Sequence, residues 1–157
     1  MIVYHGSNQP IFQPDVLHSR TNVDFGVGFY VTPLHEQAKN WCRKFQKLGD
    51  SAFVSSYELD DAAVSDFRVL RFDAYDGPWL EFILRCRKGQ DATDYDIVMG
   101  GVANDRVFDT IELLIGGLIG QDEALSRLKY VKPNYQICLR RQEAINQALH
   151  YLGSEQL

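Results

Sequence analysis

The strongest constraint on this chain is the segment from Asp24 to Thr32, which reads Asp-Phe-Gly-Val-Gly-Phe-Tyr-Val-Thr. Its two glycines stand directly before a Phe-Tyr-Val-Thr run that is typical of a β-strand. Glycine contributes no side chain to packing, so a pair of glycines beside aromatic residues indicates that the backbone must pass close to another group. The segment therefore predicts a strand at residues 29–32 that runs close against a neighbour.

Apolar residues elsewhere recur at the spacing of either strands or helices. Ala38, Trp41, Cys42 and Phe45, for example, fall on one face of a helix. Strands are expected at residues 1–4, 29–32, 52–59, 68–72, 95–99 and 135–139, and helices at 34–48, 75–87, 104–115, 121–128 and 142–152. The helices are interleaved too irregularly for a doubly wound parallel sheet, so this order predicts a mixed α+β domain.

The length and composition of the chain limit its class. A length of 157 residues fits a single domain, residues 1–157, and an apolar content of 45% supplies a core. The net charge of −5 gives no overall attraction to nucleic acids or anionic membranes, although a local basic patch is compatible with it. No apolar run reaches the length of a membrane span, and the chain opens on Ile-Val-Tyr without a signal peptide. We therefore expect a soluble, cytoplasmic protein with no membrane partner.

The three cysteines do not predict a metal or disulfide site. Cys42, Cys86 and Cys138 are widely scattered, and no pair of Cys or His residues has the spacing of zinc ligands. Each cysteine has apolar neighbours, so we expect all three to be small buried residues and expect no metal site.

Two motifs in the N-terminal third of the chain carry a resemblance to a known superfamily. Tyr4-His5-Gly6-Ser7 resembles the His-Gly-Ser/Thr strand end of ADP-ribosyltransferases of the diphtheria-toxin and poly(ADP-ribose) polymerase type. Residues 25–32 resemble the Phe-Gly-x-Gly-x-Tyr strand of the same enzymes, and residues 34–48 resemble the helix after it. The first motif is common, but the second, about twenty residues later, makes the joint signal more specific. Within the superfamily the chain looks closest to a small bacterial family of single-domain proteins of unknown function.

The resemblance implies a mixed split β-sheet with flanking helices, and NAD as the co-substrate. His5 would hydrogen-bond the ribose on the adenosine side, the backbone of Gly6 would hold the nicotinamide amide, and Ser7 would assist. Tyr30 would stack on the nicotinamide ring, which is flat and cationic in NAD. Gly28 would let the strand that carries Tyr30 pass close under that ring.

Two further positions complete the expected site. Arg20 is a candidate ligand of the NAD pyrophosphate, because a guanidinium pairs bidentately with phosphate oxygens; the alternative is a solvated loop charge. The glutamate of the superfamily falls at Gln136 in this chain. Glutamine can hydrogen-bond a ribose hydroxyl, but it has no negative charge to stabilise the oxocarbenium-like centre that forms when the nicotinamide bond breaks. Loss of such stabilisation often costs about a hundredfold in rate.

Three carboxylates elsewhere are candidates to supply the missing charge. Asp24 stands beside the glycine pair, which is consistent with a place near the cofactor. Asp105 is expected instead to stabilise the start of the helix at 104–115, and Glu112 to lie on the solvated face of that helix. Both tryptophans fall at apolar helical positions and are expected in the core.

Three functional interpretations follow. The first is a mono-ADP-ribosyltransferase that uses NAD to modify a macromolecule. The acceptor is a protein or a nucleic acid, and the negative net charge mildly favours a protein. Single-domain bacterial transferases of this type often act as toxins paired with a small antitoxin, and the resemblance extends that expectation to this chain. The second is a non-catalytic module that binds NAD or ADP-ribose, with Gln136 marking lost turnover. The third is an interaction protein that keeps the fold only as a scaffold.

Overall fold

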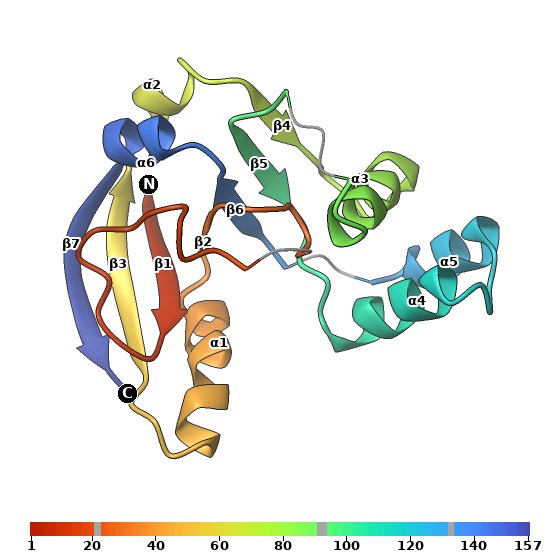
Figure 1. Cartoon of the computed structure of the whole chain (residues 1–157), viewed down its shortest axis with the longest axis horizontal. Coiled ribbons are helices and arrows are strands. Elements are labelled where there is room, and N and C mark those ends of the chain that lie inside the picture. The colour runs from red at the N-terminus through yellow and green to blue at the C-terminus, as the bar shows by residue number, and fades with distance from the viewer. Residues whose placement is uncertain (21–22, 91–93, 132–133) are drawn as a thin grey trace.

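The computed structural model describes residues 1–20, 23–90, 94–131 and 134–157, and it confirms the α+β class (Figure 1). One sheet has three antiparallel strands in the order β1 (Ile2–Ser7), β3 (Phe53–Leu59), β7 (Leu149–Gln156). The other has four strands in the order β2 (Phe29–Val31), β6 (Gln136–Leu139), β5 (Ile97–Gly100), β4 (Val69–Arg71). Only β4 and β5 are parallel, so the second sheet is mixed.

Six helices accompany the sheets in the part of the chain that the structure describes. They are α1 (His35–Lys47), α2 (Asp61–Val64), α3 (Gly77–Arg87), α4 (Asp105–Ile115), α5 (Gln121–Leu128) and α6 (Gln142–Ala148). Helix α1 packs on β1 and β3, and α2 packs on α6. Helices α4 and α5 pack on each other and form an arm that Figure 1 shows beside α3, well away from the three-stranded sheet. None of the described helices is long and apolar enough to cross a membrane.

Among the residues that the structure describes, one β-bridge joins the backbones of the two sheets, between Tyr4 of β1 and Thr32, just after β2. Tyr4 N donates to Thr32 O at 2.8 Å, and Thr32 N donates to Tyr4 O at 2.9 Å. Beyond this bridge the described residues of β1 and β2 form no further backbone pair, and the His5 ring instead bonds the backbone oxygen of Tyr30. The residues that follow Tyr4 therefore border a split between the two sheets.

Each sheet contributes to a hydrophobic core. Residues on one face of the four-stranded sheet, such as Ile137 and Leu139, join the core of the three-stranded sheet around Tyr57. The intervening Cys138 faces a second core with Trp79 and the helices α3, α4 and α5. Because successive side chains of a strand point to opposite faces, the four-stranded sheet is buried on both sides.

The largest correction to the predicted elements concerns the C-terminus. The helix predicted at 142–152 ends at Ala148, and the chain continues as β7, which pairs with β3. Leu149 and Tyr151 pack against the first core, whereas Leu152 is exposed. This alternation requires an extended chain, and pairing with a strand distant in sequence overrides the local helical pattern.

Candidate functional site

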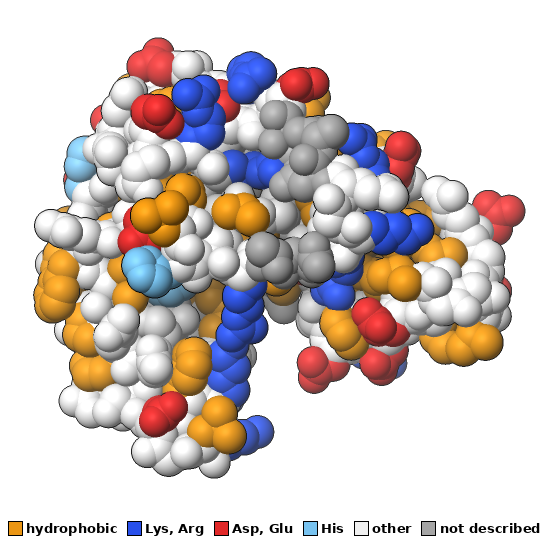
Figure 2. Space-filling view, viewed as in Figure 1, with side chains coloured by type: hydrophobic (Ala, Val, Ile, Leu, Met, Phe, Trp, Pro, Cys, Tyr) orange, Lys and Arg blue, Asp and Glu red, His pale blue; other side chains and the backbone are white. Residues whose placement is uncertain are grey.

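A cleft of about 1020 Å³ lies where the two sheets separate. Its wall includes residues of β1, β2, β6 and α1, the end of α3, the start of α4 and the loop after β1. Figure 2 shows the hollow open between the α1 side of the molecule and the α4–α5 arm. The volume matches the upper end of small-molecule sites, about 300–1,000 Å³.

The cleft brings together every residue that the sequence predicted for the site. These residues are His5, Gly6, Ser7, Arg20, Gly28, Tyr30 and Gln136. Asp24 also lines the cleft, whereas Asp105 and Glu112 do not. Segments far apart in the sequence therefore converge on one concave surface, although the role of each residue stays a prediction.

His5 has a fixed ring orientation. It lies within β1, opposite Ser55 of β3, rather than beyond the end of a strand that was expected to stop at residue 4. Its Nδ1 is 2.7 Å from the backbone oxygen of Tyr30, and its ring stacks on Phe29 with centroids 4.4 Å apart. A carbonyl oxygen only accepts hydrogen bonds, so Nδ1 carries the proton and Nε2 of the neutral ring is an acceptor. His5 thus offers an acceptor to a ligand.

Burial makes the protein sensitive to acid at His5. Burial lowers the pKa of His5 below its usual 6.5; the bond to Tyr30 opposes this effect and the charge of Lys44 adds to it. As the pH falls below 6.5, the imidazole of His5 is protonated in the unfolded chain before it is protonated in the folded protein, and this favours unfolding. The free energy of unfolding is therefore undiminished by His5 above pH 6.5, and it falls as the pH drops towards the lower pKa of the folded state. We expect urea unfolding at about pH 7.5 and about pH 5.5 to show a smaller loss in His5→Gln, which cannot titrate, than in the wild type. Equal losses in the two proteins would contradict this assignment.

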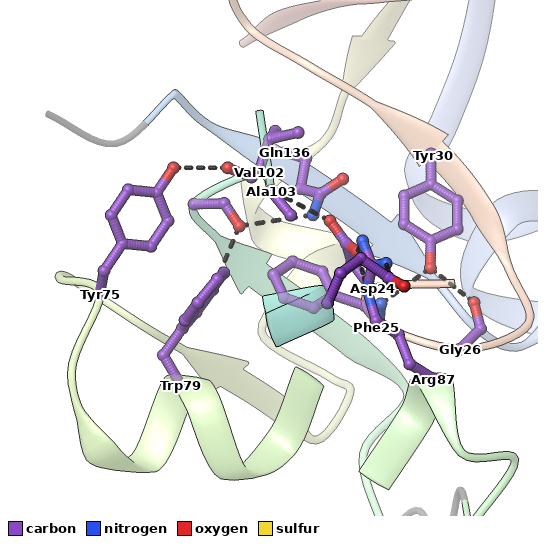
Figure 3. Close-up of polar contacts among 12 residues, drawn as sticks. Asp24, Phe25, Gly26, Tyr30, Tyr75, Trp79, Arg87, Val102, Ala103 and Gln136 are labelled. Atoms are coloured by element: carbon purple, nitrogen blue, oxygen red, sulfur yellow. Dashed lines mark hydrogen bonds and ion pairs between the residues drawn. The ribbon is translucent and has the colours of Figure 1, made fainter. Parts of the chain in front are cut away.

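Tyr30 shapes the glycine segment through its hydroxyl group (Figure 3). The hydroxyl donates to Gly26 O at 2.6 Å and accepts from Phe25 N at 3.0 Å. Burial raises the pKa of Tyr30 well above its usual value, so the phenol stays neutral. Gly26 has a φ of 77°, in the left-handed region that favours glycine. The hydroxyl is therefore occupied within the protein, and the ring is the part of Tyr30 that a ligand can contact.

Gly6 and Gly28 pass close to other parts of the protein. A Cβ atom on Gly6 would clash with the carbonyl oxygen of Ala38 in α1 and lie 2.7 Å from Cys42 Sγ. A Cβ atom on Gly28 would lie 2.5 Å from Cys138 Sγ in β6. The sequence correctly indicated that the backbone passes close to another group. That group is helix α1 at Gly6 and strand β6 at Gly28, rather than a ligand.

Gly6 nevertheless exposes polar backbone groups at the cleft. The N–H and C=O of Tyr4 point away from β3, because they bond to Thr32. In a strand, residues two apart direct these groups to the same side, so those of Gly6 also point away from β3. At this position the described part of β2 no longer pairs with the backbone of β1, because Tyr30 O accepts from the His5 ring. Gly6 thus presents one donor and one acceptor at the split between the sheets.

Asp24 is neutralised by an ion pair (Figure 3). Its Oδ1 accepts from Arg87 Nε at 3.0 Å and Nη2 at 2.5 Å, and its Oδ2 accepts from Ala103 N at 3.0 Å. Arg87 also lies 3.8 Å from Glu112 Oε1 and 4.9 Å from the centre of the Phe108 ring. Asp24 therefore ties the glycine segment to α3 and to the loop before α4, and its charge is already compensated.

The start of α4 follows the prediction in outline. Asn104 is the residue that caps the helix, because its side chain accepts from Val107 N at 3.2 Å. Asp105 follows in the first turn, where a negative charge favours the helix dipole. Asp105 thus lies at the helix start, as expected, but the side chain that caps the helix is that of Asn104.

Gln136 is buried, with 3% of its surface exposed, and its amide is oriented by the backbone. Its Nε2 donates to Gly101 O at 3.4 Å, and the same oxygen accepts from Trp79 Nε1 at 3.1 Å (Figure 3). An ionised glutamate has no proton to donate to Gly101 O. The amide therefore suits this surrounding better than a carboxylate, and its oxygen remains an acceptor at the cleft.

Two cations in the cleft have no ion-pair partner in the part of the chain that the structure describes. They are Arg20, which the sequence indicated, and Lys44 of α1, which it missed. Burial and the charge of Arg20 lower the pKa of Lys44, which indicates that the two cations lie near each other. Uncompensated positive charges of this kind suit an anionic ligand such as a phosphate.

Aromatic rings form much of the remaining wall. Phe12, Trp41, Phe45 and Phe108 all line the cleft. The expectation that both tryptophans belong to the core is wrong for Trp41, which is half-buried, and right for Trp79, which is fully buried. The helix that carries Trp41 directly follows β2, the strand of Tyr30. Its place next to this strand in the sequence is the signal that could have predicted Trp41 at the cleft.

One family model matches residues 1–151, and its description is "Protein of unknown function (DUF3990)". The chain belongs to the DUF3990 family. No curated protein and no solved structure matches it. In this DUF3990 protein no group of three or more His, Cys, Asp or Glu side chains among the described residues is placed to hold a metal ion. The cleft of the DUF3990 chain therefore has to be interpreted from its geometry.

Proposed function

We propose that the protein binds NAD in the cleft and transfers its ADP-ribose to a macromolecule. The observation that carries this proposal is the convergence of the predicted residues around Arg20 and Lys44, a pair of cations suited to a pyrophosphate. The split between the two sheets fits the ADP-ribosyltransferase-like core that the sequence resemblance implies.

The geometry suggests how each part of NAD is held. Arg20 and Lys44 bind the pyrophosphate, and Nε2 of His5 accepts from a hydroxyl of the adenosine-side ribose. The exposed N–H and C=O of Gly6 match the acceptor and donor of the nicotinamide amide. The rings of Tyr30 and Trp41 lie in the same cleft and offer flat surfaces to the cationic nicotinamide ring.

A second candidate function is a non-catalytic module that binds NAD or ADP-ribose. It is favoured by the charges at the site. Among the described residues that line the cleft, the acidic ones are Asp15 and Asp24, and they pair with His18 and Arg87. Gln136, in the superfamily's glutamate position, is uncharged, and Asp24 is compensated by Arg87, so neither offers a free negative charge to an oxocarbenium-like centre. Asp15 hydrogen-bonds the exposed His18, which is charged only when it is protonated.

One experiment tests both candidates. Purified protein is titrated with NAD by calorimetry, and it is then incubated with labelled NAD and a cell lysate. We expect saturable binding, release of nicotinamide and transfer of the label to a macromolecule. Saturable binding without release would support the binding module, and the absence of binding would contradict both candidates.

Gln136→Glu is the informative variant in this assay. A large gain in nicotinamide release at similar NAD affinity would show that the amide limits turnover. Because the new carboxylate has no proton for Gly101 O, we also compare Gln136→Met, which removes the amide without adding a charge. A gain in Gln136→Glu but not in Gln136→Met assigns the effect to the charge.

The sequence resemblance adds the proposal of a toxin in the cytoplasm that a small antitoxin neutralises. An antitoxin of this kind would have to cover the cleft. Loss of NAD binding when such a partner is added to the purified protein would support this part of the proposal.

A further inference from the structure

Helix α1 is basic in an otherwise acidic protein. It carries Lys39, Arg43, Lys44 and Lys47 against the single acid Glu36, whereas the whole chain has 16 basic and 21 acidic residues. Residues three or four apart are neighbours on a helix surface, so these four cations form one continuous stripe. The stripe ends at Lys44, inside the cleft. Positive charge thus leads from the surface of α1 to the candidate site.

The arm across the cleft carries mostly the opposite charge on its exposed surface, outside the cleft lining and with Arg106 as the one exposed cation of α4. Asp105, Asp109 and Glu112 are exposed on α4. Figure 2 shows Lys and Arg side chains along the α1 side of the hollow and Asp and Glu side chains on the arm across from it. A polyanion would therefore be attracted to α1 and repelled by α4, which fixes the side of the cleft that it can follow.

The aromatic rings indicate which polyanion fits. Phe12 is 63% exposed and Phe108 is 42% exposed, and Trp41 and Phe45 lie beside Lys44 on α1. Single-stranded nucleic acids bind in basic grooves whose aromatic side chains stack on unpaired bases. An acidic peptide would use the cations but not the rings, and a duplex keeps its bases stacked and out of reach.

We infer that the acceptor is a single-stranded nucleic acid whose phosphates follow the stripe on α1 and whose base enters the cleft. The transfer step rests on the proposed function. In it the bond between nicotinamide and ribose breaks and its electron pair leaves with neutral nicotinamide. A nitrogen or oxygen of the nucleic acid then bonds to the ribose carbon and loses its proton to solvent. A local charge stripe thus outweighs the negative net charge, which had favoured a protein acceptor.

Binding can be tested without NAD. A fluorescent single strand of about 12 nucleotides is titrated with the protein and followed by anisotropy, in DNA and RNA form, beside the matching duplex and a poly-glutamate peptide. We expect the single strands to bind in preference to the duplex and the peptide. Three phosphate contacts give a slope near −2 in a plot of log affinity against log salt, at about 0.7 per contact.

A charge-matched pair of variants locates the site. The test variant combines Lys39→Gln, Arg43→Gln and Lys47→Gln, none of which lines the cleft. The control combines Arg85→Gln, Lys88→Gln and Lys129→Gln, which are exposed elsewhere and remove the same charge. Glutamine keeps the helix propensity of these residues. We expect the test variant to lose at least about tenfold in strand affinity and most of the salt slope, and the control to lose little.

The outcomes separate this inference from the proposed function. Equal weakening in both variants, or tighter binding of the duplex or the peptide, would overturn the inference. NAD affinity, measured by calorimetry on the same proteins, is expected to be unchanged in both variants. Strand binding without NAD binding would leave the inferred surface in place and contradict the proposed function. NAD binding without strand binding would leave the proposed function in place and contradict the inferred surface.

Discussion

Arg87→Met is expected to lower the free energy of unfolding by about 3–5 kcal/mol, because it leaves the carboxylate of Asp24 buried without its counter-charge. Only 14% of the Arg87 side chain and 12% of the Asp24 side chain are exposed. For a domain of this size the loss corresponds to about 10 °C in melting temperature. Urea unfolding and calorimetry measure the two quantities.

Two further variants show whether the ion pair is the cause. In the double variant Asp24→Asn with Arg87→Met, the asparagine still accepts from Ala103 N but has no charge, so we expect part of the stability to return. Arg85→Met, on the exposed side of the same helix, is expected to change stability by less than about 0.5 kcal/mol. A double variant as unstable as Arg87→Met alone would show that the buried charge is not responsible.

His5→Ala is expected to weaken NAD binding by about tenfold to a hundredfold. The variant removes the acceptor Nε2, and the loss of one such hydrogen bond costs on the order of 1–3 kcal/mol of binding free energy. It also leaves Tyr30 O without the proton that Nδ1 donates, which lowers the stability of the fold rather than the affinity for NAD. Calorimetric titration of the wild type and the variant with NAD gives the two affinities.

His18→Ala is the matched control for this experiment. His18 also lines the cleft, but its side chain is 87% exposed and pairs with Asp15 at the surface. We expect less than about a threefold change in its NAD affinity, because exposed ion pairs contribute little. If His5→Ala remains folded and binds NAD as tightly as the wild type, the proposed position of the cofactor is wrong.

Much of the fold and the site followed from local sequence patterns. The run from Phe29 to Thr32 and the helical spacing around Cys42 each specify an element within a short window. The motif residues His5 and Tyr30 came instead from the resemblance of two short segments to a known superfamily, and both line the cleft. Local patterns predict these strands and helices because the hydrophobic periodicity of each element is contained in a few neighbouring residues.

The features that sequence reasoning missed depend on contacts between distant segments. Strand β7 forms because β3 offers its backbone edge, about ninety residues earlier in the chain, and no local pattern contains that edge. Arg87 closes the end of a predicted helix, but its pairing with Asp24 appears only when α3 packs beside the glycine segment. Lys44 belongs to no sequence motif, and only the packing of α1 against β1 brings it to the cleft.

In the described part of the chain one bridge, between Tyr4 and Thr32, joins the backbones of the two sheets, so a seam separates the sheets elsewhere. Past that bridge, the backbone of Gly6 has no described strand to pair with on the side away from β3. A ligand bonded to those groups and to Gln136 of β6 would occupy the place of that neighbour and join the two halves of the molecule. Occupancy of the cleft would then act as cross-linking across the seam, so a bound ligand would stiffen the protein as a whole.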